Sequence, residues 1–508
     1  MKHGDHRSQG SLPDRGDAAR AALPFAAVVL AMLPAVLDQT ILATGLPVIA
    51  SDLGSLGDVS WVVTAYVVAA AATTPLWGKL GDRYGRKLLL EVSLGHFLLA
   101  SALCGMAQDI TQLIAVRIVQ GAAAGGLMTL AMAAVGDLVS PRERGRYQGY
   151  IAATFAVATV VGPLLGGLLV ESASWRWVFY VNLPIGIAAL AGLHLRLPAA
   201  PADPAEHRVD VLGAILLAGA TGALMLSCIW GGARYAWDSA PILALLDATV
   251  ALATILVVHE RRVSDPIVPF HLLRTPTVAV VSTALFLATA ALFAITVFVP
   301  LFLQAATGAT PTQAGLLLAP AMLGITVSTV LSGRAISRTG RYKRFPIAGL
   351  ALMSGALLFL GLAAAEPSRL ATGAGLVVFG LGFGMVTQVL ITAIQNSVDR
   401  RELGIATATA GFFRALGGAV GAAALGAVFA AQAGSKVSEG DAGIGGIVGA
   451  DVTDGVQAVF LVAALLAALA LVAVLRLREV PLRTAAASSE KGERPATSPR
   501  QLATEAAR

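Results

Sequence analysis

Charge is scarce in this chain. Charged residues make up 13% of its 508 residues, whereas a soluble domain carries about 25%. Hydrophobic residues make up 56%, and the mean hydropathy is +0.76. Apolar runs of about 20 residues recur along nearly the whole chain, and each is long enough to cross a hydrocarbon core as a helix. The composition therefore excludes a soluble globular protein and predicts an all-α polytopic membrane protein.

Signatures of several other protein classes are also missing. The two cysteines, Cys104 and Cys228, lie inside apolar runs, so no disulfide framework is expected. There is no G-x-x-x-x-G-K-[ST] motif, which leaves an ATP-driven pump unsupported. No span pairs two histidines at i and i+4, and no acid-rich cluster predicts a metal site. No nucleophile–base constellation indicates an enzyme, and no cofactor is expected.

The apolar runs predict fourteen membrane spans. Their expected ranges are 23–46, 59–78, 88–107, 110–136, 148–170, 177–197, 211–231, 240–258, 276–303, 312–333, 345–365, 370–395, 403–430 and 456–476.

The basic residues test this count, because cytoplasmic loops collect Lys and Arg. With the N-terminus inside, the inside segments hold 30 of the 36 basic residues, the outside loops hold four, and Arg117 and Arg414 lie within spans. One missed helix would scramble this alternation, so both termini are predicted to be cytoplasmic. The net charge of +6 then belongs to the inner face of the cell membrane and not to nucleic-acid binding.

Pro-bearing linkers on either side of the seventh and eighth spans divide the chain into two sets of six spans and an inserted pair. The predicted units are a cytoplasmic tail (1–22), an N-terminal six-helix bundle (23–197), linkers with the inserted helices (198–275), a C-terminal six-helix bundle (276–476) and a disordered cytoplasmic tail (477–508).

The apolar stretch LPAVLDQTILATGLPVIA carries one carboxylate, Asp38, in its interior. Asp38 lies about eight residues from the outer end of the first span, and Arg117 about eight residues from the outer start of the fourth, so both lie about 12 Å deep. They could therefore pair or share a cavity. A carboxylate without a counter-ion in lipid readily takes up a proton. We expect Asp38 and Arg117 to form a proton-coupling site; the alternative is a fixed salt bridge that only packs the first span.

Other ionisable residues lie in or near the spans. Glu91 is about one turn from the cytoplasmic end of the third span, where it can snorkel or pair with Lys87 at i−4. His96 lies deeper and is expected to be an ordinary satisfied histidine. Asp247 belongs to the inserted pair, outside the expected central cavity. Arg414 is mid-span in a Gly-rich stretch, where a role in packing or coupling and a fixed structural pair are both open.

The most specific segment is GKLGDRYGRK, which follows the second span. Gly78 and Gly85 permit tight turns and close helix approach, and Asp82, Arg83 and Arg86 place one acid among bases at the cytoplasmic edge. A charge run of this kind is usually an ordinary positive-inside loop. The spacing G-x-L-x-D-R-x-G-R-K, however, resembles a signature of the major facilitator superfamily.

Further segments resemble the fourteen-helix drug:proton antiporters of that superfamily, although Ala43 stands where many members have Asn, and Ala158 replaces a leading Gly. These segments are LDQTILATGLP (37–47), RIVQGAAAGG (117–126), ATVVGPLLGG (158–167), WRWVFYVNLPIG (175–186) and FFRALGGAVG (412–421). The resemblance implies the major facilitator fold, in which two six-helix bundles rock between access states and two further helices are inserted centrally.

The resemblance also implies a cytoplasmic latch. Asp82 and Arg86 on the loop are expected to form a charge cluster with Asp137, which ends the fourth span on the same membrane face. A weaker echo of the loop occurs at SGRAISRTGRYK (332–343), where Ser337 occupies the place of Asp82. Such a copy fits two related halves that retain the acid in one of them.

The ATVVGPLLGG segment is implied to help seal the cavity against ion leak. Pro163 is expected to kink the fifth span, and Gly162, Gly166 and Gly167 are expected to let a neighbouring helix pack at backbone distance. Without the resemblance, a Gly-Pro kink is only common membrane-helix packing.

These features predict a proton-coupled antiporter that exports lipophilic drugs or antibiotics by alternating access. The alternative is an exporter of a specific endogenous metabolite, lipid or self-made antibiotic with the same fold, and an uptake porter comes third. The expected partners are a lipophilic small molecule, protons and membrane lipid, with the protein a monomer. The sequence does not name the substrate, because pocket selectivity depends on side chains from many helices.

Overall fold

The computed structural model describes residues 15–53, 59–139, 141–198, 210–232, 234–263, 266, 270–308, 313, 316–364, 368–399, 402–432 and 449–482. Over these residues the chain is helical apart from short connections and one isolated bridge, Gly231–Tyr235. The expected tails fall mostly outside the described residues.

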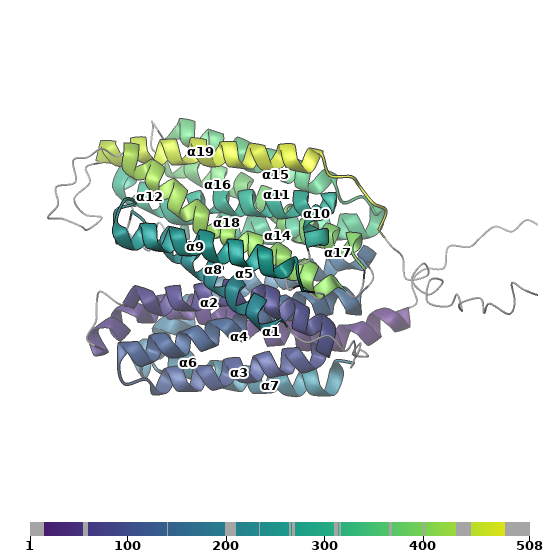
Figure 1. Ribbon diagram of the computed structural model, residues 1–508. Coiled ribbons are helices and arrows are strands. Elements are labelled where there is room, and N and C mark those ends of the chain that lie inside the picture. The colour runs from purple at the N-terminus through teal and green to yellow at the C-terminus, as the bar shows by residue number, and fades with distance from the viewer. Residues whose placement is uncertain are drawn as a thin grey trace, which may run out of the picture.

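The N-terminal bundle forms one half of the molecule (Figure 1). Its helices are α1 (Arg15–Asp52), α2 (Val59–Tyr84), α3 (Arg86–Met106), α4 (Ile110–Leu138), α5 (Pro141–Ser172), α6 (Trp177–Tyr180) and α7 (Asn182–Arg196). Local chemistry fixes several helix starts. Asp109, for example, caps α4, because its side chain accepts a hydrogen bond from the Gln112 N–H at 2.8 Å.

The inserted pair is α8 (Val211–Trp230) and α9 (Ala240–Glu260), and the C-terminal bundle follows it. The helices of that bundle are α10 (Phe270–Arg274), α11 (Pro276–Phe293), the π-helical turn η1 (Ala294–Phe298), α12 (Val299–Thr307), α14 (Ala319–Thr339), α15 (Arg344–Ala363), α16 (Arg369–Gly384), α17 (Thr387–Ser397), α18 (Leu403–Gln432) and α19 (Gly449–Leu475).

Thirteen helical segments among the described residues are long and apolar enough to cross a membrane, and they match thirteen of the expected spans. The remaining expected span, 148–170, lies inside the 32-residue helix α5. The start of α1 and the end of α19 lie at the same end of the molecule, on the right in Figure 1. The structure therefore has the predicted polytopic, all-helical fold.

Some details differ from the expected spans. The first helix begins at Arg15, because the polar residues before position 23 continue the same helix. The tenth span was expected from 312, whereas α14 begins at Ala319. The twelfth is broken between α16 and α17, where Met385 and Val386 leave the regular helix. Hydropathy detects apolar length and is insensitive to such local breaks.

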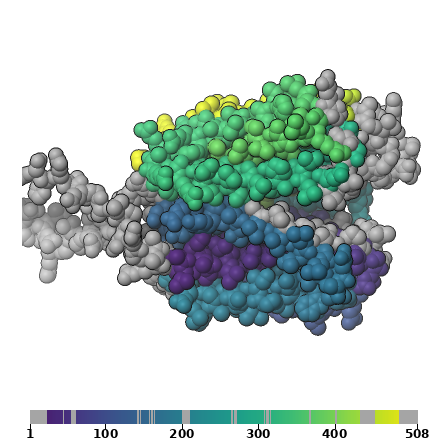
Figure 2. Space-filling view, turned by 180° about the vertical axis from the view of Figure 1, so that it is seen from behind, coloured from purple at the N-terminus to yellow at the C-terminus, as the bar shows by residue number. Residues whose placement is uncertain are grey.

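Each bundle has its own apolar core. One cluster of buried side chains runs from Leu272 to Leu477 in the C-terminal bundle, and two clusters lie within the N-terminal bundle. The bundles meet mainly through α2 with α18 and α5 with α14, with smaller contacts of α4 with α18 and of α5 with α17. Figure 2 shows the N-terminal bundle, purple to blue, and the C-terminal bundle, green to yellow, meeting along one seam. The two bundles are thus separate packing units.

The inserted pair packs beside one of these contacts. Helix α8 lies against α9, and it also contacts α2 of one bundle and α18 of the other. The aromatic rings of Trp230 on α8 and Trp61 on α2 are 4.8 Å apart and edge to face. The pair therefore covers the α2–α18 side of the junction.

Candidate functional site

Asp38 on α1 and Arg117 on α4 form an ion pair inside the N-terminal bundle. The Arg117 Nη1 atom donates to Asp38 Oδ2 at 2.5 Å, and the two side chains are 0% and 1% exposed. The equal depths expected from helix rise therefore bring the two groups into contact. Burying two charges costs solvation free energy. Removing either partner would leave the other charge uncompensated and would destabilise the fold by about 3–5 kcal/mol.

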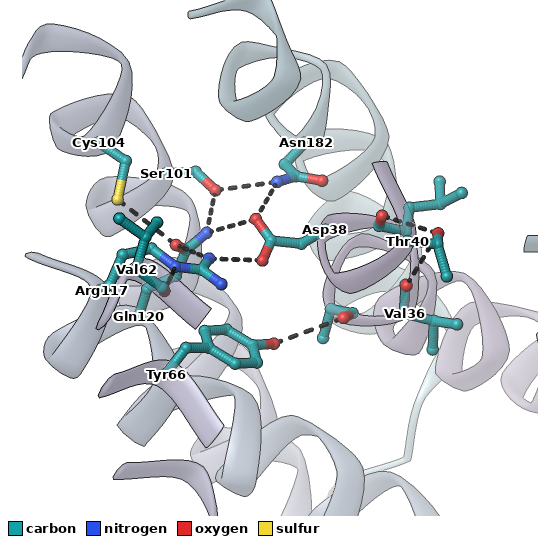
Figure 3. A network of polar contacts seen from close by, with 12 residues as sticks. Val36, Asp38, Thr40, Val62, Tyr66, Ser101, Cys104, Arg117, Gln120 and Asn182 are labelled. Atoms are coloured by element: carbon teal, nitrogen blue, oxygen red, sulfur yellow. Dashed lines mark hydrogen bonds and ion pairs between the residues drawn. The ribbon is translucent and has the colours of Figure 1, made fainter. Parts of the chain in front are cut away.

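Amide and hydroxyl groups complete the site (Figure 3). Asp38 Oδ1 accepts from Gln120 Nε2 at 3.1 Å and from Asn182 Nδ2 at 3.3 Å. The same two amide nitrogens donate to Ser101 Oγ, at 2.7 and 3.1 Å. Helices α4 and α7 thus hold both oxygens of the carboxylate that α1 supplies, and Ser101 of α3 holds the two amides.

Arg117 also fixes α2 to the site. Its Nε atom donates to the Val62 carbonyl at 3.0 Å, and its guanidinium lies 4.1 Å from the centre of the Tyr66 ring. The two helices approach closely here because of Gly121, where a Cβ atom would be 2.3 Å from the Tyr66 carbonyl oxygen. The pair therefore connects four helices of the bundle when α7 is included.

The network contains an acceptor for a further proton. Asp38 accepts only from donors in the structure, which is the arrangement of an ionised carboxylate. Asn182 Oδ1 is buried and makes no hydrogen bond among the described residues. A neutral carboxyl group needs an acceptor for its O–H, and rotation of the Asn182 amide would present one. The site can accordingly satisfy both protonation states of Asp38.

A second charge cluster lies at the cytoplasmic ends of α2 and α4. Arg86 Nη2 donates to Asp82 at 2.8 Å, and Arg86 Nη1 donates to Asp137 and, at 3.0 Å, to the Ala133 carbonyl. Arg83 stacks over the ring of Tyr84. The structure therefore brings together the three charges expected in the latch.

Asp82 also reaches the other bundle. Its Oδ1 and Oδ2 atoms accept from the backbone N–H groups of Gly404 and Ile405, both at 2.8 Å, at the start of α18. A carboxylate at a helix N-terminus is favoured by the free N–H groups and the helix dipole. Gly78 lies one turn earlier, where a Cβ atom would be 2.5 Å from Ala408 Cβ. The cytoplasmic ends of the bundles are thus in contact.

Residues 28–422 match the model of the Major Facilitator Superfamily. The chain belongs to the Major Facilitator Superfamily. It is 36% identical over 483 residues to an uncharacterised MFS-type transporter of Mycobacterium tuberculosis, covering 91% of this chain and 70% of the relative. It is 33% identical over 428 residues to the multidrug transporter protein MdtP of Bacillus subtilis, covering 84% and 78%.

A solved structure also has this fold. The human organic anion transporter MFSD10 superposes with a TM-score of 0.65, over 89% of this chain and 99% of that protein, at 18% identity. At this identity the likeness establishes the fold alone. The protein is therefore a multi-pass membrane transporter of the superfamily, with relatives named as multidrug transporters.

The two loops that carry the superfamily motif each place a glycine with a positive φ at the corresponding position, with different ψ angles. Gly85 between α2 and α3 has a φ of 89°, and Gly340 at the end of α14 has a φ of 70°. Both values lie in the left-handed region that favours glycine. Ser337, which replaces the acid in the second copy, donates to the Gly333 carbonyl of its own helix at 3.0 Å. Both halves thus retain a glycine with a positive φ, and Asp82 makes the contact with the start of α18.

The antiporter motif gives a mixed result. Gly162 faces α1, where a Cβ atom would be 2.0 Å from Thr40 Oγ1, and Thr40 donates to the Ala158 carbonyl at 3.2 Å. The expectation of close packing at Gly167 is wrong, because among the described residues a Cβ atom there would meet nothing within 4 Å. The side chain of Pro163 is not among those described, so the kink stays a prediction. The packing role of Gly166 likewise stays a prediction.

The WRWVFYVNLPIG segment fastens the extracellular end of α1. Trp175 Nε1 and Arg176 Nη1 both donate to Asp52 Oδ2, at 2.7 and 3.1 Å. These two hydrogen bonds, from Trp175 and then from Arg176, hold the pKa of Asp52 below its ordinary value. The segment therefore supplies a structural clamp at one end and Asn182 of the buried site at the other.

The remaining ionisable candidates lie away from this network. Glu91 approaches His194 at 3.5 Å, whereas Lys87 donates to the His194 carbonyl. Of the two alternatives for Glu91, pairing with Lys87 is thus replaced by a contact with α7. His96 is exposed on α3 and bonds the Val92 carbonyl. Asp247 is exposed on α9, and Arg414 is exposed on α18.

Sequence reasoning did not single out three members of the site, Ser101, Gln120 and Asn182. Gln120 lies one turn after Arg117 on the same helix face, and this spacing could have indicated it. Asn182 lies in a segment that resembles the family. Ser101 carries no signal, because a serine inside an apolar helix usually bonds its own backbone.

Proposed function

We propose that the protein is a proton-coupled antiporter that exports lipophilic compounds across the cell membrane. The supporting observation is the buried Asp38–Arg117 pair with its amide shell, which can satisfy Asp38 with or without a proton. Ionisable groups inside spans that face a bundle interior are associated with proton relays. No ATP-binding motif occurs in the sequence, so an ion gradient is the energy source.

The proton site and the cytoplasmic latch share one helix. Helix α2 holds Arg117 through Val62 and Tyr66, and it carries Asp82 about 20 residues, or 30 Å, farther along. Protonating Asp38 removes the charge that Arg117 pairs with, which changes how α1, α2 and α4 hold together. Because α2 packs on α18, a shift of α2 biases the contact of Asp82 with that helix. In this scheme, proton uptake favours release of the cytoplasmic contact.

The test uses purified protein in vesicles of neutral lipid. In separate experiments, rhodamine 6G, a lipophilic cation, and fluorescein, an amphipathic anion, are loaded on one side, and an inward or outward pH gradient is imposed. The proposal expects dye movement opposite to the proton gradient, abolished by an ionophore that collapses the gradient. Dye movement that is independent of the gradient would leave facilitated diffusion, and gradient-driven movement in the proton's direction would indicate symport.

A further inference from the structure

Helix α18 packs on two neighbours with two different faces. The contact residues are Gly404, Ala408 and Gly411 toward α2, and Gly417 and Gly421 toward α11. At about 100° per residue, position 414 lies in the sector between these faces. The same sector contains Thr407, two turns earlier.

Thr407 shows where this sector points. The Gln395 Nε2 atom of α17 donates to Thr407 Oγ1 at 3.0 Å and to the Met132 carbonyl of α4 at 3.3 Å. Gln395 therefore joins both bundles at the centre of the molecule, near their cytoplasmic contact. Arg414 lies about 10 Å farther along α18, toward the extracellular side, on the same sector. Arg414 thus lies on the extracellular side of the contacts that join Gln395, Thr407 and Met132.

The surroundings of Arg414 are unusual for a charge at mid-span. Its side chain is exposed on α18, in the sector that Thr407 places toward Gln395 and the junction of the two bundles. Among the described residues no carboxylate pairs with it, in contrast to Arg117, whose charge Asp38 balances. An unbalanced cation inside a membrane protein is costly, and an anionic ligand would offset that cost.

An aromatic ring lies one turn beyond this cation. Gly418 faces Phe293, and a Cβ atom there would be 2.8 Å from the ring. Phe293 is partly buried against the C-terminal core, and it directly precedes the π-helical turn η1. Single π-helical turns are frequent at functional sites. The Phe293 ring thus packs on α18 one helical turn beyond Arg414.

We infer that Arg414 binds the anionic group of an amphipathic organic anion, with the apolar part of that molecule toward Phe293. The inference rests on the proposed export function and assigns its substrate class: carboxylates and sulfonates with an aromatic or aliphatic body. A planar guanidinium suits such groups because it can donate two parallel hydrogen bonds to one carboxylate. Arg414 is then a substrate-binding residue, and the open alternatives of helix packing and a fixed ion pair do not apply.

The test measures binding at equilibrium, which needs neither a proton gradient nor transport. Purified protein in phosphatidylcholine nanodiscs is titrated with fluorescein, an anionic xanthene, and with rhodamine 6G, a cationic xanthene, by fluorescence anisotropy. Arg414→Gln should weaken fluorescein binding about tenfold or more, since a charge-assisted bidentate contact is lost. Rhodamine 6G binding should be unchanged or tighter. Arg414→Lys should fall between, because it keeps the charge and loses the fork.

Arg476→Gln is the matched control. Arg476 is an exposed arginine at the cytoplasmic end of the same bundle, beyond α19, and its variant should bind both dyes as the wild type does. Rhodamine 6G binding and the elution volume report whether Arg414→Gln is folded. If Arg414→Gln is not folded, the wild-type protein provides the test, because it should bind fluorescein more tightly than the uncharged compound fluoran.

The contrary results are specific. Fluorescein binding within about twofold of wild type in folded Arg414→Gln, or no saturable fluorescein binding by the wild type, overturns the assignment. The binding assay does not depend on protons. Loss of proton coupling in the vesicle assay alone would therefore contradict the proposed antiport and would not affect the assignment of the anion site. Intact proton coupling with no effect of Arg414→Gln on fluorescein binding would contradict the anion site and would not affect the proposed antiport.

Discussion

Asp82 lies in the last turn of α2 in one bundle, and its carboxylate accepts a hydrogen bond from the backbone N–H of Gly404 at the start of α18 in the other. Its two oxygens accept from consecutive backbone N–H groups at 2.8 Å. Arg86 holds the same carboxylate from the side and pairs it with Asp137. The superfamily motif thus makes its contact across the junction, and this contact closes the cytoplasmic end.

Asp82→Asn should slow turnover with little loss of substrate affinity. An amide oxygen replaces one carboxylate oxygen, while the amide N–H₂ opposes the second backbone donor and the Arg86 guanidinium. A charged hydrogen bond is worth about 1.5–3 kcal/mol, so the balance between access states should shift by about tenfold or more. Initial rates at saturating substrate measure turnover, and equilibrium dye binding measures affinity. Unchanged turnover would falsify the latch.

Gly78→Val should block closure of the cytoplasmic end for a steric reason. A Cβ atom at Gly78 would lie 2.5 Å from Ala408 Cβ and 2.7 Å from the Gly404 carbonyl oxygen, and backbone cannot yield as a flexible side chain does. Gly167→Val on α5 is the matched control, because no other helix among the described residues comes within 4 Å of its Cβ position. Labelling of a cysteine introduced at Gln395 should become faster in Gly78→Val and remain slow in the control. Equal labelling rates in the two variants would show that the side chain at position 78 does not control the closing of α2 on α18.

Much of this arrangement follows from the sequence, and the reasons for the rest are physical. The Asp38–Arg117 contact could be anticipated because helix rise fixes depth, and only one pair of opposite charges shared that depth in the first and fourth spans. The Asp82–Gly404 contact could not, because its partners are 322 residues apart and the acceptor meets backbone, which has no sequence signature. Packing at Gly162 and its absence at Gly167 depend on how α1 and α5 cross, which spacing does not determine.

Asn182→Leu should impair coupling more than folding. The substitution removes one donor to Asp38 and the buried Oδ1 acceptor that would receive a proton from it, while Gln120 and Arg117 still hold the carboxylate. We expect dye transport whose dependence on pH is shifted, with a fall in rate of about tenfold, because one hydrogen bond to a charged group is lost. The pH–rate profile is the informative measurement. A profile identical to wild type at an equal protein level would assign Asn182 to packing only.

Asp247→Asn should retain at least about half of wild-type transport. Asp247 is exposed on α9, the outer member of the inserted pair, and α9 makes its main contact with α8. The two bundles whose relative motion gives alternating access are complete without this helix. Transport and proton coupling are measured at matched protein levels. Loss of coupling here would place α9 on the proton path and overturn the assignment of the pair to a covering role.

The most direct measurement of the central claim is proton-coupled dye counterflow with Asp38→Asn. The amide retains the shape of the carboxylate and cannot cycle a proton, so gradient-driven transport should fall to the level of empty vesicles while expression and dye binding persist. Exchange of dye across the membrane without a gradient should continue, because it needs no protonation step. Gradient-driven transport by Asp38→Asn at the wild-type rate would contradict the account and leave the buried pair with Arg117 as a structural salt bridge.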